Sequence, residues 1–571
     1  MTVDTGMATP AAHDYIPGTV HLVDLQGTIH ARHAEGGKHD IVLVPAPSAN
    51  PDDPLNWTPR RKLLSLFCLS IYILAVGYAS AAIYSVLVPI SEATNLSVSD
   101  LNAGTGYMFL AFGWGCLVWQ PLAQQYGKRP VYLFSTLATM ADESSLVEQA
   151  IMIWAPYTTS NGQWIANKIL QGFFGAPIES LCEISVSDLY FTHERGTYMG
   201  VYALFLAGSN FLAPIFSGFI NDGQGWQWVL FWCAIFNGGA LIILFFLMEE
   251  TNYYRKPLLA VEPDDESTAE ETAISAGSKA GDSADPEKTA QNNVNNDSSI
   301  ANVGIGHSET FQKKTYVQKL ALLRKEDLQK RNQLKGMFLR PLIFASIPGI
   351  AFSGFMYGSI VCYFNILNGT SSLILADAPY NFPSSMVGLS YVSCLIGVLL
   401  GAFYSGPLGD RFILWKARKN NGVMEPEHRL WLYSALFVLI PGGFLIWGPG
   451  AAHHIHWFGL VFAMGMLAAS ITIGCQLPVS YCIDSYKDVS GDGMVTVILI
   501  RNTMSFSVSY GITPWVTNMG YQNAFITAAC VACAQISLFL VFIKWGRRMR
   551  KASATRYLKY VKQIEDDGLV H

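Results

Sequence analysis

Two acidic residues lie inside a segment that is otherwise apolar enough to cross a membrane. Glu179 and Glu183 fall within residues 163–188, which exceed the roughly 20 residues that a spanning helix needs. A charge facing lipid at the bilayer centre would cost about 2.5–3.5 kcal/mol, so these carboxylates must face protein or water. Their i, i+4 spacing places both on one side of a helix. The pattern predicts an acidic site for protons or cations inside a membrane protein.

Two further charges extend this acidic site along the same segment. Lys168 lies about three turns before Glu179, and Asp188 lies at the other end of the segment. We interpret the whole set as a charged path through the membrane, because ionisable residues within spanning segments are usually functional. The alternative is that these charges only pair with neighbouring helices and hold them together.

A second apolar segment carries a positive charge. Arg501 is followed by Asn502 and lies about a third of the way into this segment from its cytosolic end. An arginine at this depth needs a carboxylate partner. The motifs SVSDLY and CIDSY place Asp188 and Asp484 at equivalent cytosolic ends of two spans. We expect Arg501 to pair with Glu183, Asp188 or Asp484 and so to close a cytosolic gate.

The composition identifies a polytopic membrane protein. The 571 residues are 51% hydrophobic and only 14% charged, whereas about 25% of the residues of a soluble protein are charged. Most of the cysteines lie in apolar segments and are interpreted as small buried side chains rather than a disulfide framework. The sequence shows no metal-ligand cluster, nucleotide-binding loop or nucleophile with its base. We therefore expect neither an enzyme nor a primary pump, and no cofactor or metal.

Twelve apolar segments divide into two sets of six. They predict an all-α membrane fold with six-helix bundles at residues 61–248 and 341–548. Residues 249–340 form a polar linker, for which we expect a disordered middle and a basic amphipathic helix at its end. Residues 1–60 and 549–571 are expected to be polar cytosolic tails.

The third predicted span is interrupted. Residues 141–149 read ADESSLVEQ and place Asp142, Glu143 and Glu148 at mid-membrane depth. Without these residues, the flanking apolar stretches would join into one span of ordinary length. We therefore expect residues 141–149 to be an insertion that the mature protein lacks, such as an unspliced intron.

The distribution of Lys and Arg predicts the orientation. Every second loop lacks Lys and Arg, and the remaining loops carry them, so by the positive-inside rule both termini are cytosolic. Two glycosylation sequons, at Asn95 and Asn368, fall in predicted exterior loops. We expect both to be glycosylated in a protein of the plasma membrane, with the vacuolar membrane as the alternative.

Two loops resemble a signature of the major facilitator superfamily. In the loop after the second span, the positions of this signature are occupied by Gln120, Gln124, Gln125, Gly127, Lys128 and Arg129, so the basic end is kept and the signature's aspartate is missing. The corresponding loop of the second half has Gly406, Asp410 and Arg411. The resemblance places Asp410 and Arg411 at the gate. Within the superfamily, the chain resembles the fungal twelve-helix group of drug:proton antiporters.

Two helix motifs extend this resemblance. The fourth span has Lys168 and Gln171 where the family has Arg and Gln, and the resemblance assigns the basic residue to proton coupling. The fifth span matches the antiporter motif in register, with several of its glycines replaced by other small residues. A plain close helix crossing would also explain the small residues. The positions of this helix-5 motif are Gly200, Ser209, Ala213, Pro214, Ser217 and Gly218.

Three shorter stretches resemble the branch that includes fungal histidinol and polyamine transporters. They are EISVSDLYFTHERG, EPEHRLW and IDSYK with the later pair RN. The resemblance implies a cationic substrate, for which two carboxylates would supply the opposite charge. Four aromatic residues could add cation–π contacts, although for most of them we expect packing or a place in the interfacial aromatic belt: Trp114, Trp119, Tyr357 and Tyr363.

These observations predict a proton-coupled secondary transporter of a small cationic molecule. The two halves would rock about a site near the membrane midplane, with Glu179, Glu183 and Lys168 binding the substrate or protons in turn. The expected partners are membrane lipid, the substrate and protons, with no nucleic acid, and we expect a monomer. One alternative is an efflux pump for a drug, toxin or secondary metabolite. The other is a nutrient sensor that binds without transporting.

Overall fold

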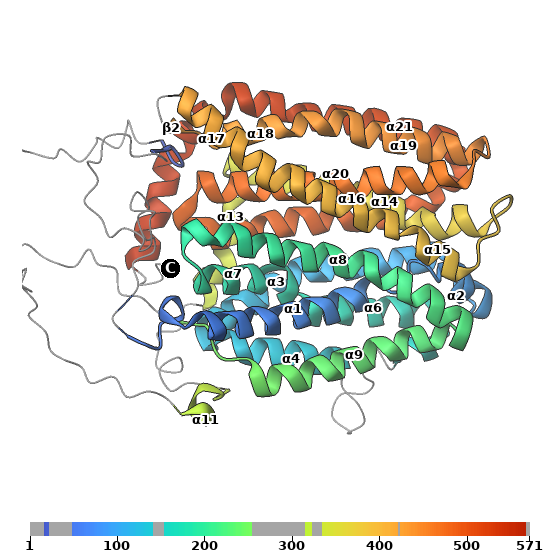
Figure 1. Cartoon of the computed structure of the whole chain (residues 1–571), viewed down its shortest axis with the longest axis horizontal. Coiled ribbons are helices and arrows are strands. Elements are labelled where there is room, and N and C mark those ends of the chain that lie inside the picture. Colours follow the sequence, from blue (N-terminus) through green and yellow to red (C-terminus); the bar gives the residue numbers. More distant parts are fainter. Residues whose placement is uncertain are drawn as a thin grey trace, which may run out of the picture.

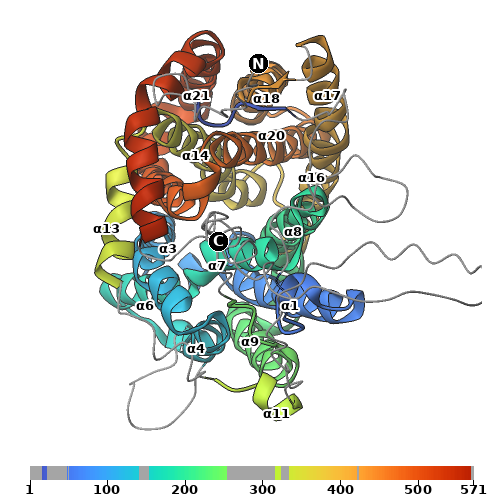
Figure 2. The same ribbon diagram turned by 90° about the vertical axis from the view of Figure 1, so that its left-hand side faces the viewer.

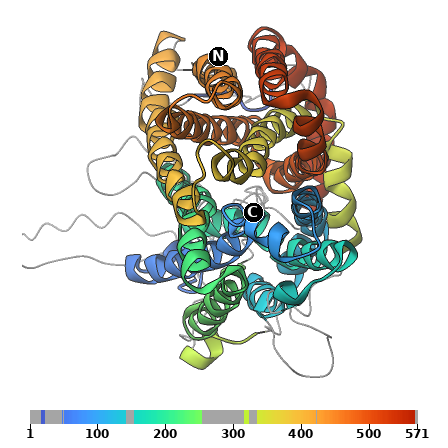
Figure 3. The ribbon, with the colours of Figure 1, turned by 90° about the vertical axis from the view of Figure 1, so that its right-hand side faces the viewer.

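The computed structural model describes residues 16–21, 48, 50–140, 154–253, 315–322, 334–420 and 423–566. Long helices lie side by side along the long axis of the molecule (Figure 1). Viewed along that axis from either end, the helices of the first half form one group and those of the second half another (Figures 2 and 3). The predicted residues 141–149 insertion lies outside the described residues.

The first half has one helix or helix pair for each predicted span. Its elements are η1 (Pro54–Asn56), α1 (Pro59–Ala81), α2 (Leu87–Ala93), α3 (Val98–Tyr126), α4 (Lys128–Met140), η2 (Ala155–Tyr157), α6 (Asn161–Gly175), α7 (Pro177–Leu189), α8 (Thr192–Gln224) and α9 (Trp226–Leu247). The predicted first span therefore divides into α1 and α2, and the predicted fourth span into α6 and α7.

The second half repeats the plan with more interruptions. Its elements are α13 (Leu334–Phe344), α14 (Pro348–Ala376), α15 (Ser384–Ser390), α16 (Val392–Phe403), η3 (Tyr404–Leu408), α17 (Gly409–Lys419), α18 (Glu427–Leu430), η4 (Trp431–Ala435), α19 (Leu436–Ala452), α20 (Trp457–Ser485), η5 (Lys487–Val489) and α21 (Ser490–Asp566). The label α21 covers two helices that meet at Gly520, whose φ of 74° is not helical.

Eight described helices are long and apolar enough to cross a membrane. One of these stretches, Ser490–Gln563, contains the two predicted last spans on either side of Gly520. The other predicted spans correspond to α3, α4 and the pair α6–α7. Of these, α4 has only 13 described residues, and the α6–α7 break leaves helices of 15 and 13 residues.

Two polar segments have secondary structure that was not predicted from the sequence. The predicted C-terminal tail is helical as far as Asp566, as the last part of α21. In the N-terminal tail, β1 (Val20–His21) pairs antiparallel with β2 (Val423–Met424) of the second half. Of the predicted amphipathic helix in the linker, the described residues include α11 (Tyr316–Lys319) and the start of α13.

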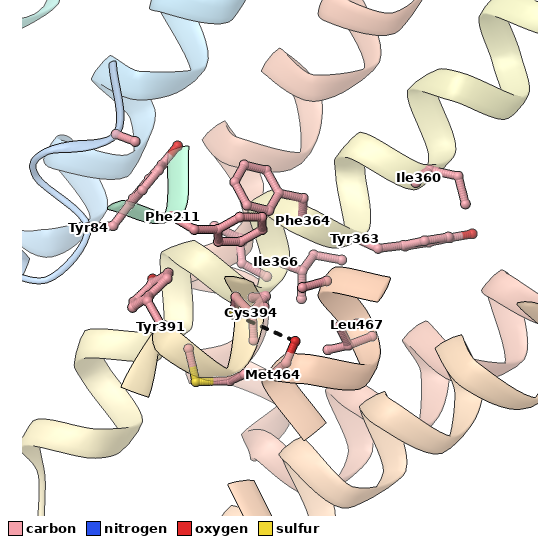
Figure 4. Packing of buried hydrophobic residues seen from close by; sticks show 14 of the residues in the cluster. Tyr84, Phe211, Ile360, Tyr363, Phe364, Ile366, Tyr391, Cys394, Met464 and Leu467 are labelled. Atoms are coloured by element: carbon pink, nitrogen blue, oxygen red, sulfur yellow. Dashed lines mark hydrogen bonds between the residues drawn. The ribbon is translucent and has the colours of Figure 1, made fainter. Parts of the chain in front are cut away.

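Aromatic side chains from the two halves pack against each other near the predicted exterior. Phe364 of α14 packs edge-on against Tyr84 and Phe211 of the first half, with ring centroids 6.4 and 5.5 Å apart. Phe211 also lies 6.4 Å from Tyr391, between α15 and α16. Figure 4 shows these rings gathered around one point in the buried cluster. Their burial holds α8 and α14 together at this end of the molecule.

The helix-5 motif packs α8 against two neighbours. On one face, Ser209 lies against Gly77 of α1, and the Ser217 hydroxyl is 3.5 Å from that of Tyr78. On the other face, Gly218 lies against the Ser384 backbone of α15. Ala213 is fully buried, Pro214 faces Gly388 of α15, and Gly200 has open space beside it. The small residues of this motif therefore allow close helix packing across the two halves.

We expect Gly218→Ala to lower the stability of the protein by about 1–3 kcal/mol, as overpacking does. A Cβ atom at Gly218 would lie 2.9 Å from the Ser384 carbonyl carbon and 3.0 Å from Ser385 Cα. Gly208, on the same helix, has open space where its Cβ would be, so Gly208→Ala is the matched control. Thermal unfolding of the purified protein measures both. An equal effect of the two substitutions would contradict the close α8–α15 contact.

Candidate functional site

The fourth predicted span breaks next to its acidic residues. Ala176 separates α6 from α7, and Pro177 occupies the first turn of α7, where its missing N–H costs no hydrogen bond. This break places Glu179 in the first turn of α7. The N-terminus of a helix carries a partial positive charge that favours a carboxylate there. The sequence predicted both acids on one helix but did not predict that the helix begins just before them.

Glu179 forms an ion pair across the two halves. Its carboxylate accepts a hydrogen bond from Arg501 Nη2, on α21, and the two side chains are only 11% and 6% exposed. Arg501 Nη1 donates to the Tyr357 hydroxyl of α14 at 2.9 Å, and the guanidinium lies 4.8 Å above that ring. Asn502 Oδ1 accepts from Arg501 Nε at 3.2 Å. A buried charge is therefore neutralised by a partner in the other half of the molecule.

Glu183 lies one turn beyond Glu179 on the same side of α7, as the spacing predicted. Its side chain is half-buried. Among the described residues Glu183 forms no ion pair, whereas Glu179 does. The two predicted site carboxylates thus differ: Glu179 is compensated by an arginine, and Glu183 has no ion-pair partner among the described residues.

Arg501 does not pair with any of the three acids that the sequence suggested, so that prediction is wrong. Asp188 forms an ion pair with Lys128, which lies at the start of α4. Asp484 pairs with Arg429 at 3.1 Å. Both acids lie at the ends of their helices, while Arg501 lies deeper, at the level of Glu179. Arg501 therefore lies beside Glu179 and away from the ends of α7 and α20 where Asp188 and Asp484 lie.

Asp188 and Asp484, which the sequence suggested are equivalent, have ion-pair partners in corresponding places. Each acid lies at the end of a helix and binds a basic residue at the start of the preceding span, Lys128 in α4 or Arg429 in α18. Asp410 joins the second pair weakly, with 4.0 Å between its Oδ1 and Arg429 Nη1. Arg411 is exposed on α17 and forms neither pair among the described residues.

The loop that lacks the family aspartate has an acidic contact that the sequence did not reveal. Glu250, just after α9, accepts hydrogen bonds from the backbone N–H groups of Lys128 at 3.1 Å and Arg129 at 2.9 Å. These are otherwise unpaired donors at the start of α4. Gly127 precedes them with a φ of 111°, which suits glycine. The adjacent acids Glu249 and Glu250 at the end of a span were the available signal.

Lys168 lies apart from the central ion pair. Its ammonium is buried, donates to Gln171 Oε1 at 2.8 Å and lies 4.8 Å from the Trp164 ring centre. Eleven residues separate Lys168 from Glu179 in the sequence, which corresponds to about 16 Å of helix. The structure therefore does not bring Lys168 to Glu179 or Glu183, and its role in proton coupling stays a prediction.

Of the four aromatic candidates, Tyr357 is the one that contacts a cation among the described residues, because the Arg501 guanidinium lies over its ring. Trp114 is 50% exposed on the outside of α3. Trp119 donates to the Phe173 carbonyl, and the Tyr363 hydroxyl donates to Gln535. Packing therefore accounts for Trp119 and Tyr363, whereas Trp114 faces outward from the bundle.

The two predicted glycosylation sites have different surroundings. Asn95 is exposed in the turn between α2 and α3. Asn368 is fully buried within α14, and its Oδ1 accepts a hydrogen bond from the Tyr391 hydroxyl at 3.1 Å. The helix continues through this polar sequence, and the Thr370 and Ser371 hydroxyls are satisfied within it by donating to carbonyls one turn back. A glycan on Asn368 is incompatible with this burial, so that prediction is wrong.

We expect Asn95→Gln to remove the shift in electrophoretic mobility that endoglycosidase treatment produces, because Asn95 is the exposed member of the two sequons. Asn368→Gln should leave that shift unchanged. Immunoblots of membranes from a glycosylating host measure both. A shift that disappears with Asn368→Gln and persists with Asn95→Gln would contradict this placement.

Comparison with known proteins agrees with this architecture. The model of the Major Facilitator Superfamily matches residues 69–486. An uncharacterised MFS-type transporter of Schizosaccharomyces pombe is 26% identical, with 96% of this chain and 94% of the relative covered. Protein HOL1 of Saccharomyces cerevisiae is also 26% identical, with 96% and 97% covered. The xylose transporter XylE of E. coli, in a partially occluded inward-open conformation, aligns with a TM-score of 0.49 and 14% identity over 84% of this chain and 99% of its own.

The family match covers most of the chain and includes α7 with its two acidic residues and the loop that begins α4. Members of this family carry small molecules across membranes, and the apolar helices described above suit that role. The chain belongs to the major facilitator superfamily and is a multi-pass membrane transporter.

Proposed function

We propose that the protein is a proton-coupled transporter of a small organic cation. The observation that carries this proposal is the buried pair of Glu179 and Arg501 between the two halves, with Glu183 one turn away and without an ion pair among the described residues. Such a site offers carboxylates to a cation at the point where the halves meet. In this superfamily fold, that point lies near the membrane midplane.

Exchange of partners at Glu179 would couple binding to movement. A substrate cation that binds Glu179 replaces Arg501, so the carboxylate stays compensated while the link between the halves is released. Leaving either ion buried without a partner costs about 3–5 kcal/mol, which disfavours release before the substrate arrives. Tyr357 and Asn502 remain hydrogen-bond partners for the freed guanidinium.

Glu183 would hold the proton. A carboxylate buried without a partner is unfavourable, and binding a proton removes its charge. A cation arriving at the adjacent Glu179 would favour the ionised form of Glu183 and expel the proton. Proton and substrate would then occupy the acidic face of α7 in turn. Lys168, on α6, would adjust this exchange from the predicted exterior side.

Efflux of an organic compound is the second candidate function. It is favoured by the helix-5 motif, whose small residues bring α8 close to α15 at Gly218 and Gly388. The resemblance of this motif to that of antiporters supports export against a proton gradient. Both candidates use the same ion pair, and they differ in the direction of net substrate movement across what we expect to be the plasma membrane.

Uptake of radiolabelled spermidine tests the proposal, in yeast lacking its own polyamine carriers and with or without a protonophore. Accumulation that the protonophore abolishes is expected. A Glu179→Gln variant at equal surface expression provides the matched negative control. Absence of accumulation would favour efflux, which loading the cells with labelled substrate and measuring its loss then tests. A version lacking residues 141–149 should be assayed in parallel.

A further inference from the structure

The last part of α21 leaves the membrane and docks on the second half by one face. Figures 1 and 2 show it, in red, turning across the end of the helix bundle next to α13. Arg550 is fully buried and binds Glu427 through two hydrogen bonds, of 2.8 and 2.6 Å. Tyr557 packs on Tyr486 with ring centres 5.7 Å apart, and the Ser553 hydroxyl lies 3.2 Å from that of Tyr486. These contacts fix the orientation of the helix about its axis.

The opposite face of this helix is strongly basic. Residues 544–562 contain no Asp or Glu. Apart from the buried Arg550, their basic side chains are all exposed: Lys544, Arg547, Arg548, Lys551, Arg556, Lys559 and Lys562. Arg547 forms an ion pair with Glu425 at 3.4 Å. Four others, called here the basic face, form no ion pair among the described residues: Arg548, Arg556, Lys559 and Lys562.

The neighbouring helix α13 has an exposed apolar face. Four of its apolar side chains are 40–44% exposed: Phe338, Leu339, Leu342 and Ile343. Side chains of this kind on a helix at the end of a membrane bundle belong in the interfacial layer of the lipid. Phe344, on the buried side of α13, packs edge-on against Tyr560 with ring centres 5.2 Å apart. Tyr560, which contacts α13 in this way, lies within one helical turn of Arg556 and Lys559 of the basic face.

We propose that the basic face binds anionic phospholipid headgroups of the cytosolic leaflet. Two independent features meet there: four exposed cations that form no ion pair among the described residues, and an adjacent helix with exposed apolar side chains. The cytosolic leaflet is rich in anionic lipids, and basic clusters directly after a membrane span bind them. The proposal uses the predicted cytosolic orientation of the C-terminus and does not depend on the substrate or on proton coupling.

Bound headgroups would stabilise the docked position of the helix. The same helix contacts Tyr486, directly after α20, and the Arg550–Glu427 pair, at the start of α18. Asp484 and Arg429, which pair at that end of the second half, lie within two residues of these contacts. Lipid composition would in this way act on the cytosolic end of the second half.

The test uses the purified full-length protein with vesicles of phosphatidylcholine alone or mixed with phosphatidylserine. Lipid retention is measured by native mass spectrometry and stability by thermal unfolding. The test variant is Arg548→Gln/Arg556→Gln/Lys559→Gln/Lys562→Gln. The matched control exchanges Arg and Lys at the same four positions and so keeps the charge. We expect the wild type and the control to retain phosphatidylserine selectively, and the Gln variant to bind it about tenfold more weakly or worse.

Three outcomes would overturn the proposal. The first is a wild-type protein that does not distinguish phosphatidylserine from phosphatidylcholine. The second is a Gln variant with undiminished selectivity, which would place the lipid elsewhere. The third is competition by inorganic phosphate as strong as by phosphatidylserine vesicles, which would indicate a general anion site rather than a lipid surface. Circular dichroism establishes that the Gln variant is folded, as expected for four exposed side chains.

Discussion

Arg501→Ala is expected to abolish substrate transport, whereas Arg501→Lys is expected to retain a measurable part of it. Alanine leaves Glu179 buried without its partner, which costs about 3–5 kcal/mol. Lysine restores the charge but not the contacts that the guanidinium makes with Tyr357 and Asn502, because it has a single nitrogen. Initial rates of transport, normalised to surface expression, measure the difference.

A double substitution separates loss of charge from loss of structure. Glu179→Gln/Arg501→Gln removes both ions and should recover most of the stability that Arg501→Ala loses, because no buried charge then remains uncompensated. Transport should stay absent in the double variant, since no carboxylate at this position is left for a cation. Equal loss of transport by Arg501→Ala and Arg501→Lys at normal surface expression would contradict a simple charge pair.

Glu183→Gln is expected to remove the pH dependence of transport while substrate binding persists. The substitution keeps the size of the side chain but cannot take up or release a proton. The wild-type uptake rate should fall as the external pH rises, because fewer protons are available to drive entry. In the variant the rate should be low and nearly independent of pH. Uptake measured across a series of external pH values, with and without a protonophore, gives both profiles.

Glu183→Asp is the matched control for this prediction. It keeps an ionisable carboxyl group one methylene shorter and should retain pH dependence at a reduced rate. Glu179→Gln, in contrast, should abolish substrate binding itself, because it removes the carboxylate that Arg501 compensates. An unchanged pH profile in Glu183→Gln, together with a lost profile in Glu179→Gln, would assign the proton to Glu179 instead.

Hydropathy and charge in the sequence determined the class and the plan of the molecule. The cost of a lone charge in lipid acts at each position independently, so Glu179, Glu183 and Arg501 could be selected without knowing their neighbours. The same reasoning gave the two sets of six spans, and the family match confirmed the superfamily. The small residues of the helix-5 motif were also visible in the sequence, because close helix packing leaves a local signature, and Gly218 lies against the backbone of α15.

Partner choice was decided only by the tertiary structure. Arg501 needed a carboxylate, but which one depended on how far each acid lies from the membrane surface in the folded bundle. The break at Ala176 and Pro177 set that depth by starting α7 just before Glu179. Asn368 shows the same limit, since a sequon between apolar runs reads as a loop and proved to be the buried interior of α14.

Glu250 shows the same limit. The missing aspartate after the second span was visible in the sequence, but the residue that binds Lys128 and Arg129 comes more than a hundred positions later. The need of a buried or membrane-embedded charge for a partner is a local property, which one residue and its environment determine. The identity of the partner is a property of the packed helices, because side chains distant in the sequence meet only after the two bundles have formed.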